Sequence, residues 1–292
     1  MKRTQANSLS ILIFLFIFFL ITSCGTVSAA YGQESTSESI DSLVPSWKPL
    51  YDSIDGFNYF AGRISSPRLE FHALRIDLQN PQLEIFVAAG ERSVKTSSFV
   101  RDNKLLAGIN ALPFDPASAR EGEKRTNIGI VISNYEVFSS AHSSFDSLVF
   151  FEDGRAEIMP QSRISSGPPR IKNAVGGFYT ILKNGEPMPR VLEIKTRHPR
   201  SAAGISSNGR YLYLLVIDGR RYSSIGSTEE ETALILKKLG AVDGINFDGG
   251  GSSAMAIRFP EGNVRVLNTP IHGGIAGRER AVAGCLGIRL KD

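Results

Sequence analysis

The residues best suited to chemistry lie in the segment 246–255, which has the sequence NFDGGGSSAM. Asp248 comes directly after an apolar run that predicts a strand. Three glycines and two serines follow directly: Gly249, Gly250, Gly251, Ser252 and Ser253. The glycines let the backbone turn sharply or approach a ligand closely. A carboxylate, N–H groups and hydroxyls at a strand end suit a phosphate or sugar site, although they also suit a structural turn. No Walker loop is present, because no Gly-Lys-Ser/Thr follows.

A second candidate group follows the apolar run 211–217, where Asp218, Gly219, Arg220 and Arg221 are consecutive. A carboxylate beside a guanidinium at the end of a strand can grip phosphate. An Asp-Gly pair is equally typical of a plain hairpin turn, so both interpretations stay open. Arg200, in the sequence HPRSA, is a further group that can bind an anion.

Glu231 also has two interpretations. Thr228 and Glu231 have the spacing of a capping box, in which the glutamate reaches back to the amide of the capping residue. A glutamate at a helix start can alternatively form a catalytic pair with an aspartate at a strand end. The four histidines are isolated in the sequence, and each is more typical of a structural residue than of a catalytic one.

The elements that must position these groups are mostly strands, so we predict an α+β fold with mixed or antiparallel sheets and helices packed outside. Strands are predicted from short apolar or alternating runs at 71–78, 83–88, 105–110, 128–133, 148–151, 211–217, 242–247 and 281–288. Run 211–217 has no polar residue, which is typical of a strand buried on both faces. Helices are predicted at 96–103 and 229–239, and the second has three glutamates in its first turn and Gly240 after its last.

The first residues predict an export signal. Lys2 and Arg3 precede an apolar run of 11 residues at 11–21, which is shorter than a transmembrane helix requires. The sequence ITSC then resembles a bacterial lipobox, with Cys24 as the lipidated residue. An ordinary secretory signal cut near Ala30 and an uncleaved anchor are the alternatives. We expect a lipoprotein signal over 1–23, a flexible tether over 24–46 and one domain over 47–292.

Composition excludes several classes of protein. The chain has 292 residues, 42% of them hydrophobic, which is enough for a packed core. The net charge of +4 comes partly from the predicted signal, and no block rich in Lys and Arg remains, so we expect no nucleic-acid partner. Cys24 and Cys285 are the two cysteines. They cannot form a cysteine-based zinc site, and we expect Cys285 to be a small buried apolar residue.

Taken in order, these segments resemble the phosphodiester glycosidase family. The motifs that carry the resemblance are Asn-Ala-Val-Gly-Gly at 173–177, Pro-Arg-Ser-Ala at 199–202, Asp-Gly-Arg at 218–220, Glu-Thr-Ala at 231–233, the glycine-rich segment at 246–253 and Glu-Arg at 279–280. The resemblance covers residues 56–290. It implies hydrolysis of the glycosidic C–O bond of a sugar-1-phosphodiester, a reaction suited to two carboxylates around an oxocarbenium-like transition state.

The resemblance also implies roles for individual residues. Asp248, Asp218 and Glu231 are then the candidate catalytic carboxylates. Arg200, Arg220 and Arg280 are candidates to hold phosphate, and Asn110 and residues 249–253 to contact phosphate or sugar. A divalent cation near the phosphate is a further possibility. The expected substrates are sugar-1-phosphodiesters or phosphoglycans of the bacterial envelope or exopolysaccharide, and the expected membrane contact is the lipid on Cys24.

One segment departs from the family pattern. The family has Asn-Gly-Gly followed by two aromatic residues, where this chain has NALPFD at 110–115. The side chain of Ala111 and the stiff ring of Pro113 can reshape a pocket. Two alternatives therefore stay open: a surface phosphoglycan-binding lipoprotein with a disabled site, and a serine hydrolase that uses Ser252 or Ser253 as nucleophile.

Overall fold

The computed structural model describes residues 35–88, 90–117, 120–164 and 170–291. They belong to one compact unit that begins at Ser35. The predicted signal peptide and Cys24 lie outside the described residues. Within the described ranges, none of the helices has the length and apolar character needed to span a bilayer.

The largest sheet has nine strands and positions most of the candidate residues. Its strands, in spatial order, are β1 (Ser35–Ser37), β3 (Phe57–Ile64), β4 (Leu69–Asp77), β17 (Tyr211–Ile217), β16 (Arg200–Ile205), β18 (Asp243–Asn246), β14 (Tyr179–Lys183) and β15 (Glu186–Pro187), and β2 (Lys48–Pro49) pairs with β3. The β1–β3 pair is parallel and the other pairs are antiparallel.

Two five-stranded sheets accompany the large one in the described ranges. One has the order β20 (Val264–Val266), β19 (Met255–Arg258), β6 (Ala107–Asn110), β23 (Cys285–Leu290) and β5 (Leu83–Val87). The other has the order β10 (Glu136–Ser139), β9 (Val131–Ser133), β13 (Ile171–Gly176), β11 (Asp146–Phe151) and β12 (Ala156–Pro160). Two short pairs are β7 (Phe114–Asp115) with β8 (Thr126–Asn127), and β21 (Ile271–His272) with β22 (Ile275–Ala276).

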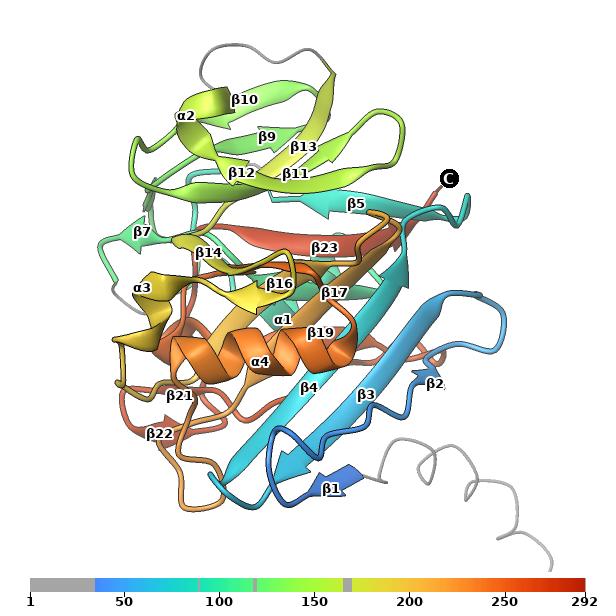
Figure 1. Cartoon of the computed structure of the whole chain (residues 1–292). Coiled ribbons are helices and arrows are strands. Elements are labelled where there is room, and N and C mark those ends of the chain that lie inside the picture. The colour runs from blue at the N-terminus through green and yellow to red at the C-terminus, as the bar shows by residue number, and fades with distance from the viewer. Residues whose placement is uncertain (1–34, 89, 118–119, 165–169, 292) are drawn as a thin grey trace, which may run out of the picture. The chain divides into compact units, whose positions relative to one another are not determined.

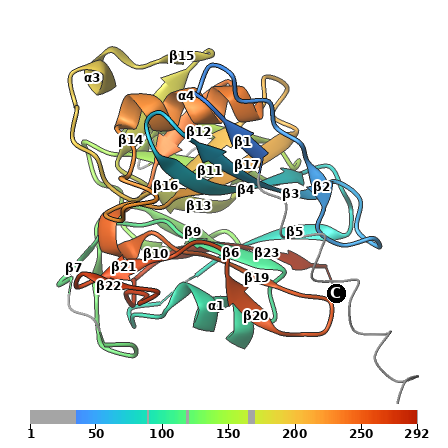
Figure 2. The ribbon, with the colours of Figure 1, turned by 90° about the horizontal axis from the view of Figure 1, so that it is seen from below.

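The helices lie outside the sheets (Figures 1 and 2). They are α1 (Thr96–Asp102), α2 (Gln161–Ile164), α3 (Pro189–Leu192) and α4 (Glu229–Leu239), with a 3-10 turn η1 (Gly250–Ser252). Helix α4 covers one face of the nine-stranded sheet, and the sheet that contains β6 lies against the other face (Figure 2). Helix α1 covers the far side of the β6 sheet. The predicted α+β fold with external helices is therefore confirmed.

Burial of apolar strands explains the order of the large sheet. Strand β17 is apolar throughout and lies between β4 and β16, with six of its seven residues buried. One core forms where Leu215 and Ile217 of this strand meet Leu236 and Leu239 of α4. Apolar burial of this kind contributes about 25 cal/mol per Å². The central, buried position predicted for this strand is confirmed.

Local signals set both ends of α4. Glu231 N donates to Thr228 Oγ1 over 3.1 Å, and Thr228 N donates to Glu231 Oε2 over 3.0 Å, which completes the predicted capping box. At the other end, Gly240 adopts a left-handed conformation with φ 111°. Its backbone N–H donates to the last-turn carbonyls of Leu236 and Lys237. The predicted bounds of α4 are confirmed.

The folded unit starts earlier than the predicted boundary at residue 47. Residues 35–46 were expected to belong to a flexible tether, yet β1 pairs with the edge strand β3. Ile40 and Leu43 are buried in the core beside α4. The physical reason is that an unpaired sheet edge offers backbone partners even to a polar segment. The tether prediction is therefore wrong for residues 35–46, and residues 24–34 lie outside the described ranges.

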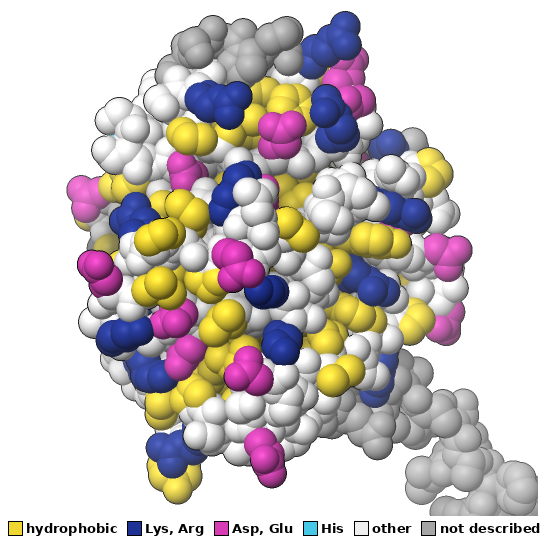
Figure 3. Space-filling model, viewed as in Figure 1, with side chains coloured by type: hydrophobic (Ala, Val, Ile, Leu, Met, Phe, Trp, Pro, Cys, Tyr) yellow, Lys and Arg dark blue, Asp and Glu magenta, His cyan; other side chains and the backbone are white. Residues whose placement is uncertain are grey.

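Surface charge is mixed on the face shown in Figure 3. Lys and Arg side chains are interspersed there with Asp and Glu, and apolar side chains lie between them. Cys285 is fully buried in β23, as expected, and burial raises the pKa of its thiol to about 12.

We predict that Gly240→Ala lowers the free energy of unfolding by about 2 to 3 kcal/mol. A β-carbon there would combine left-handed strain with overpacking, since it would lie 2.6 Å from Tyr213 Oη. Gly262→Ala is the matched control, because Gly262 has φ 93° but open space around the added atom. It should cost only about 1 kcal/mol. Urea titration measures both values, and equal losses would contradict the Tyr213 contact.

Candidate functional site

Strand register brings the predicted site segments to one end of the nine-stranded sheet. Arg200, the first residue of β16, pairs with Ile217, the last residue of β17. Asn246, the last residue of β18, pairs with Ala202 two residues further along β16. The segments that contain Asp218 and Asp248 therefore leave the sheet at the same end, on either side of β16. An antiparallel bridge between His198 and Ser227 brings the start of α4 to the same end.

Asp248 lies in a turn that two backbone contacts hold. Its own N–H donates to the Ala111 carbonyl over 2.8 Å, and Gly250 N donates to the Pro199 carbonyl over 2.8 Å. Burial raises the pKa of the Asp248 carboxyl to about 6, although a hydrogen bond from Ser252 and the nearby Arg280 favour its charged form. A carboxylate held in this way can exchange a proton near neutral pH.

Two guanidinium groups pack against the glycine turn. A β-carbon on Gly250, where φ is 62°, would lie 3.0 Å from Arg220 Nη2. A β-carbon on Gly251 would lie 2.7 Å from Arg280 Nη2. The glycines therefore let both guanidiniums approach the backbone that follows Asp248. Arg220 is exposed and Arg280 is partly buried, so this end of the sheet can attract an anion.

Arg280 is positioned from several directions. Its Nη1 donates to Ser252 Oγ over 3.3 Å, and its Nε donates to His272 Nδ1 over 3.2 Å. Burial and the charge of Arg280 lower the pKa of His272, which favours the neutral imidazole that can accept this bond. The preceding Glu279 accepts a 3.0 Å hydrogen bond from Ser97 N in the first turn of α1. This contact ties the Arg280 segment to α1.

Asp218 lies at the same end of the sheet but is fully engaged by the protein. Its Oδ1 accepts from Thr269 N at 2.9 Å and from Asn268 Nδ2 at 3.2 Å. Its Oδ2 accepts from Arg221 Nη2 at 2.9 Å. Burial raises the pKa of Asp218 to about 6, and Arg221 opposes the shift. The carboxylate therefore anchors the start of the hairpin that contains His272.

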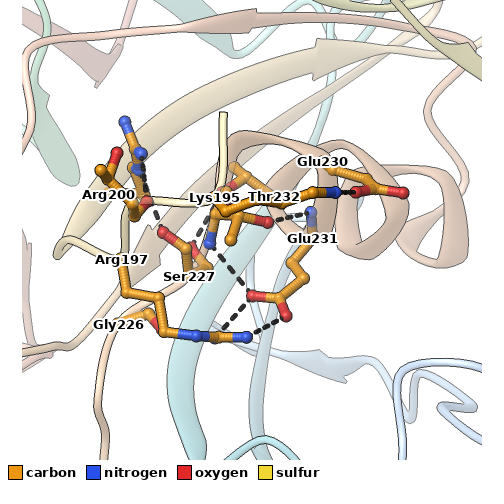
Figure 4. Close-up of polar contacts among 10 residues, drawn as sticks. Lys195, Arg197, Arg200, Gly226, Ser227, Glu230, Glu231 and Thr232 are labelled. Carbon is orange, nitrogen blue, oxygen red and sulfur yellow. Dashed lines mark hydrogen bonds and ion pairs between the residues drawn. The ribbon is translucent and has the colours of Figure 1, made fainter. Parts of the chain in front are cut away.

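Glu231 is also engaged by protein groups (Figure 4). Arg197 Nη1 lies 2.7 Å from Oε2, and Arg197 Nη2 lies 2.5 Å from Oε1. Together with the capping box, this ion pair uses both carboxylate oxygens. Glu231 is therefore placed to fix the start of α4 and the segment that leads to Arg200.

Glu229 is a further buried carboxylate at this end of the sheet, and it was not predicted from the sequence. Its Oε1 accepts from Tyr179 Oη at 2.7 Å and from Arg200 Nη1 at 3.2 Å. Arg200 also donates to the carbonyls of Ser227 and Thr196, each over 3.3 Å. The three consecutive glutamates gave no sequence signal for Glu229, because only the rotation of α4 decides which one turns inward.

Asn110 is a scaffold residue with no exposed surface. Its Nδ2 donates to the Asp248 carbonyl over 2.6 Å, and its Oδ1 accepts from Ser201 Oγ and from Ala254 N. The structure therefore places its amide inside the protein, where it holds the loop 248–254 between two sheets. Ala111 and Leu112 beside it are also fully buried, so the side chains that replace the family glycines pack into the core.

The serine and metal alternatives gain no geometric support. Ser252 hydrogen-bonds to Asp248 and Arg280, and Ser253 is completely buried. In the described part of the chain, no contact joins either hydroxyl to a histidine. No group of three His, Cys, Asp or Glu side chains among the described residues could hold a metal ion. A single carboxylate beside a guanidinium does not fit the oxygen-rich shell that a divalent cation prefers.

The model of the phosphodiester glycosidase family matches residues 103–289, which is more than half of the chain. The protein belongs to the phosphodiester glycosidase family. The match includes every segment at the shared end of the nine-stranded sheet, from Asn110 to Arg280. The predicted family is confirmed.

Solved structures share the fold of this family member. The catalytic domain of zebrafish N-acetylglucosamine-1-phosphodiester alpha-N-acetylglucosaminidase, auto-inhibited by its pro-peptide, superposes with a TM-score of 0.63 at 17% identity. The match covers 85% of this chain and 89% of that domain. A hypothetical protein from Synechocystis gives a TM-score of 0.58 at 14% identity, covering 80% of this chain and 62% of that one.

A curated relative is the SPbeta prophage-derived uncharacterized protein YomE of Bacillus subtilis. The alignment of 171 residues is 28% identical and covers 56% of this chain. The chain spans 25% of the length of that relative.

We predict that Asn110→Ala lowers the free energy of unfolding by about 3 kcal/mol, because it leaves buried partners of the amide without hydrogen bonds. Ser201→Ala is the matched control, since it removes only the hydroxyl that donates to Asn110 Oδ1. That variant should lose about 1 kcal/mol. Thermal and denaturant unfolding measure both. A loss for Asn110→Ala no larger than that for Ser201→Ala would show that the amide does not hold the loop.

Proposed function

We propose that this protein is an exported hydrolase that cleaves the glycosidic C–O bond of sugar-1-phosphodiesters. Water supplies the hydroxyl that ends on the sugar C1, and the phosphate leaves as a phosphomonoester. The observation that carries this proposal is the Asp248 carboxylate in a turn against which Arg220 and Arg280 pack. The expected substrate is similar to an N-acetylglucosamine-1-phosphodiester, the group in the name of the zebrafish enzyme.

The charges in the site suit a departing phosphate. Arg280 and Arg220 provide guanidinium groups that can bind phosphate oxygens in bidentate fashion. Phosphate is already a fair leaving group, so stabilising its developing charge matters more than protonating it. Arg280 is held by Ser252 and His272, so it needs little reorganisation during the reaction.

Asp248 acts in its ionised form in this proposal. A carboxylate beside C1 stabilises the positive charge of an oxocarbenium-like transition state, or attacks C1 directly. With a pKa of about 6, Asp248 is largely ionised at neutral pH. Asp218 and Glu231 act as positioning residues, because protein groups already use their oxygens. Asp218 holds the hairpin with His272, and Glu231 fixes the start of α4.

The proposed location of the substrate rests on the predicted export signal at residues 1–23. A lipid on Cys24 would hold the protein at a bacterial membrane, outside the cytoplasm. Polymers with sugar-1-phosphate links in the envelope or exopolysaccharide would be within reach there. Labelling of whole cells with a radioactive fatty acid, in wild type and Cys24→Ala, tests this membrane location independently of activity.

We predict that Asp248→Asn lowers kcat/KM on a N-acetylglucosamine-1-phosphodiester by about 10³-fold or more, because the neutral amide cannot stabilise positive charge at C1. Release of free sugar measures the effect, and circular dichroism verifies the fold. Asp153→Asn, at an exposed turn where the carboxylate pairs with Arg155, is the control and should keep full activity. Unchanged turnover by Asp248→Asn would remove Asp248 from the site. Binding without turnover by the wild type would favour the phosphoglycan-binding alternative.

The pH dependence of kcat/KM should report the ionisation of Asp248. Since the ionised carboxylate is active and its pKa is about 6, the rate should fall about tenfold per pH unit below 6 and level off above it. Arg280→Gln removes a cation that favours the charged form, so the profile should move to higher pH. Arg101→Gln, an exposed arginine paired with Asp102 on α1, should leave the profile unmoved. A shift to lower pH in Arg280→Gln would contradict this assignment.

A further inference from the structure

A buried polar cluster lies beneath the start of α4, next to the Asp248 turn. Glu229, the first residue of α4, is only 4% exposed, and Arg200 is 7% exposed. Tyr179 reaches the same carboxylate from β14, on the other side of β18. Tyr179 itself is partly exposed, so the cluster lies just below the surface. The Tyr179 and Arg200 contacts both go to Oε1 of Glu229.

The second carboxylate oxygen of Glu229 has no protein partner. Oε2 is buried and makes no hydrogen bond with any described residue. Asn246 presents a second acceptor of this kind, because its Oδ1 is also buried and unpartnered within the described ranges. Asn246 lies opposite Tyr179 on one side and Ala202 on the other. Its side chain is therefore on the face of the sheet that α4 covers, with Tyr179 and Ala202.

Two unpartnered buried acceptors on one face are costly for the free protein. Each such oxygen has lost its hydrogen bonds to water without gaining one from the protein. Buried polar groups are paired in most of a folded protein, so exceptions at a functional site point to a partner that arrives from outside. A molecule that binds here must donate hydrogen bonds, because both atoms are acceptors.

The charge balance narrows the chemistry of that molecule. Arg200 already provides a positive charge beside the Glu229 carboxylate, so a cationic ligand would meet repulsion. An anion would meet the same carboxylate. Neutral donors remain, namely hydroxyl and amide N–H groups. Sugars carry several such groups on one rigid ring, so they match a pair of acceptors that are fixed by secondary structure.

The cluster continues directly into the site described above. Asn246 precedes Asp248 by two residues on the same chain segment, and Pro199 O, next to Arg200, holds Gly250 N. The charges of Arg200, Arg220 and Glu229 all act on the imidazole of His198. A sugar whose C1 lies at Asp248 and whose phosphate lies at Arg220 and Arg280 can extend its ring toward this cluster.

We propose that Glu229 and Asn246 form the sugar-recognition subsite, in which Glu229 Oε2 accepts a hydrogen bond from a ring hydroxyl or the N-acetyl N–H. This inference rests on the proposed function. Arg200 and Tyr179 are positioning residues that fix Glu229 through Oε1. Arg200, predicted from the sequence to hold phosphate, then acts on the sugar side through Glu229.

The test pairs substrate changes with a protein change. The probes are the methyl phosphodiester of N-acetylglucosamine 1-phosphate, its 3-, 4- and 6-deoxy analogues and its 2-hydroxy counterpart. In wild type, removal of the group that meets Glu229 should lower kcat/KM by about 10- to 100-fold. In Glu229→Gln, whose amide turns a donor toward the ligand, that same removal should change kcat/KM less than about threefold.

Matched controls separate recognition from folding. Glu230→Gln changes the neighbouring glutamate, which pairs with Lys195, and should keep the full discrimination of wild type. If Glu229→Gln fails to fold, Glu229→Asp, which withdraws the carboxylate, should lose the same discrimination. Equal loss of kcat/KM on every analogue would overturn the subsite, because a structural role alone gives that result. No turnover of any probe by wild type would instead overturn the proposed function, and the subsite with it.

Discussion

The arrangement of the site depends on one buried amide, that of Asn110. It reaches from β6 in one sheet to Ser201 on β16 in another, and it holds the Asp248 carbonyl and the Ala254 N–H on either side of the glycine turn. A buried hydrogen-bond network stabilises the fold by more than the sum of its separate bonds, because breaking any one bond leaves a desolvated polar group without a partner. The two sheets and the turn between them are therefore fixed together.

The rigid turn sets the electrostatics of Asp248. Burial disfavours the charged form of this carboxylate and raises its pKa, because it outweighs the nearby cation and hydrogen bonds. Arg280 remains beside it because Gly251 carries no side chain. Asp218 is also buried, but its oxygens accept hydrogen bonds from Arg221, from the side-chain amide of Asn268 and from the backbone N–H of Thr269. Two aspartates at the same end of the sheet, after strands on either side of β16, thus differ in how many of their oxygens protein groups already use.

Much of the fold could be predicted because its signals are local. Thr228 and Gly240 mark the ends of α4 through contacts within one helical turn, and the wholly apolar run of β17 indicates its central place in the sheet. The boundary at residue 47 was wrong because Ile40 and Leu43 are too sparse to form a pattern. Their burial depends on a sheet edge formed by residues that follow later in the chain.

The sequence by itself determined the family, the helix and strand identities near the site, and the prominence of Asp248 before three glycines. Only the tertiary structure decided which acidic residues keep a carboxylate oxygen that protein groups do not use. Glu229 and Glu231 are two positions apart, and a helix rotates by about 100° per residue, so one faces Arg200 and the other faces Arg197. The tertiary structure also places the Asn110 amide between two sheets, where it bonds to Asp248, Ser201 and Ala254. The partners of these side chains come from strands that are distant in sequence, and no local sequence pattern encodes such contacts.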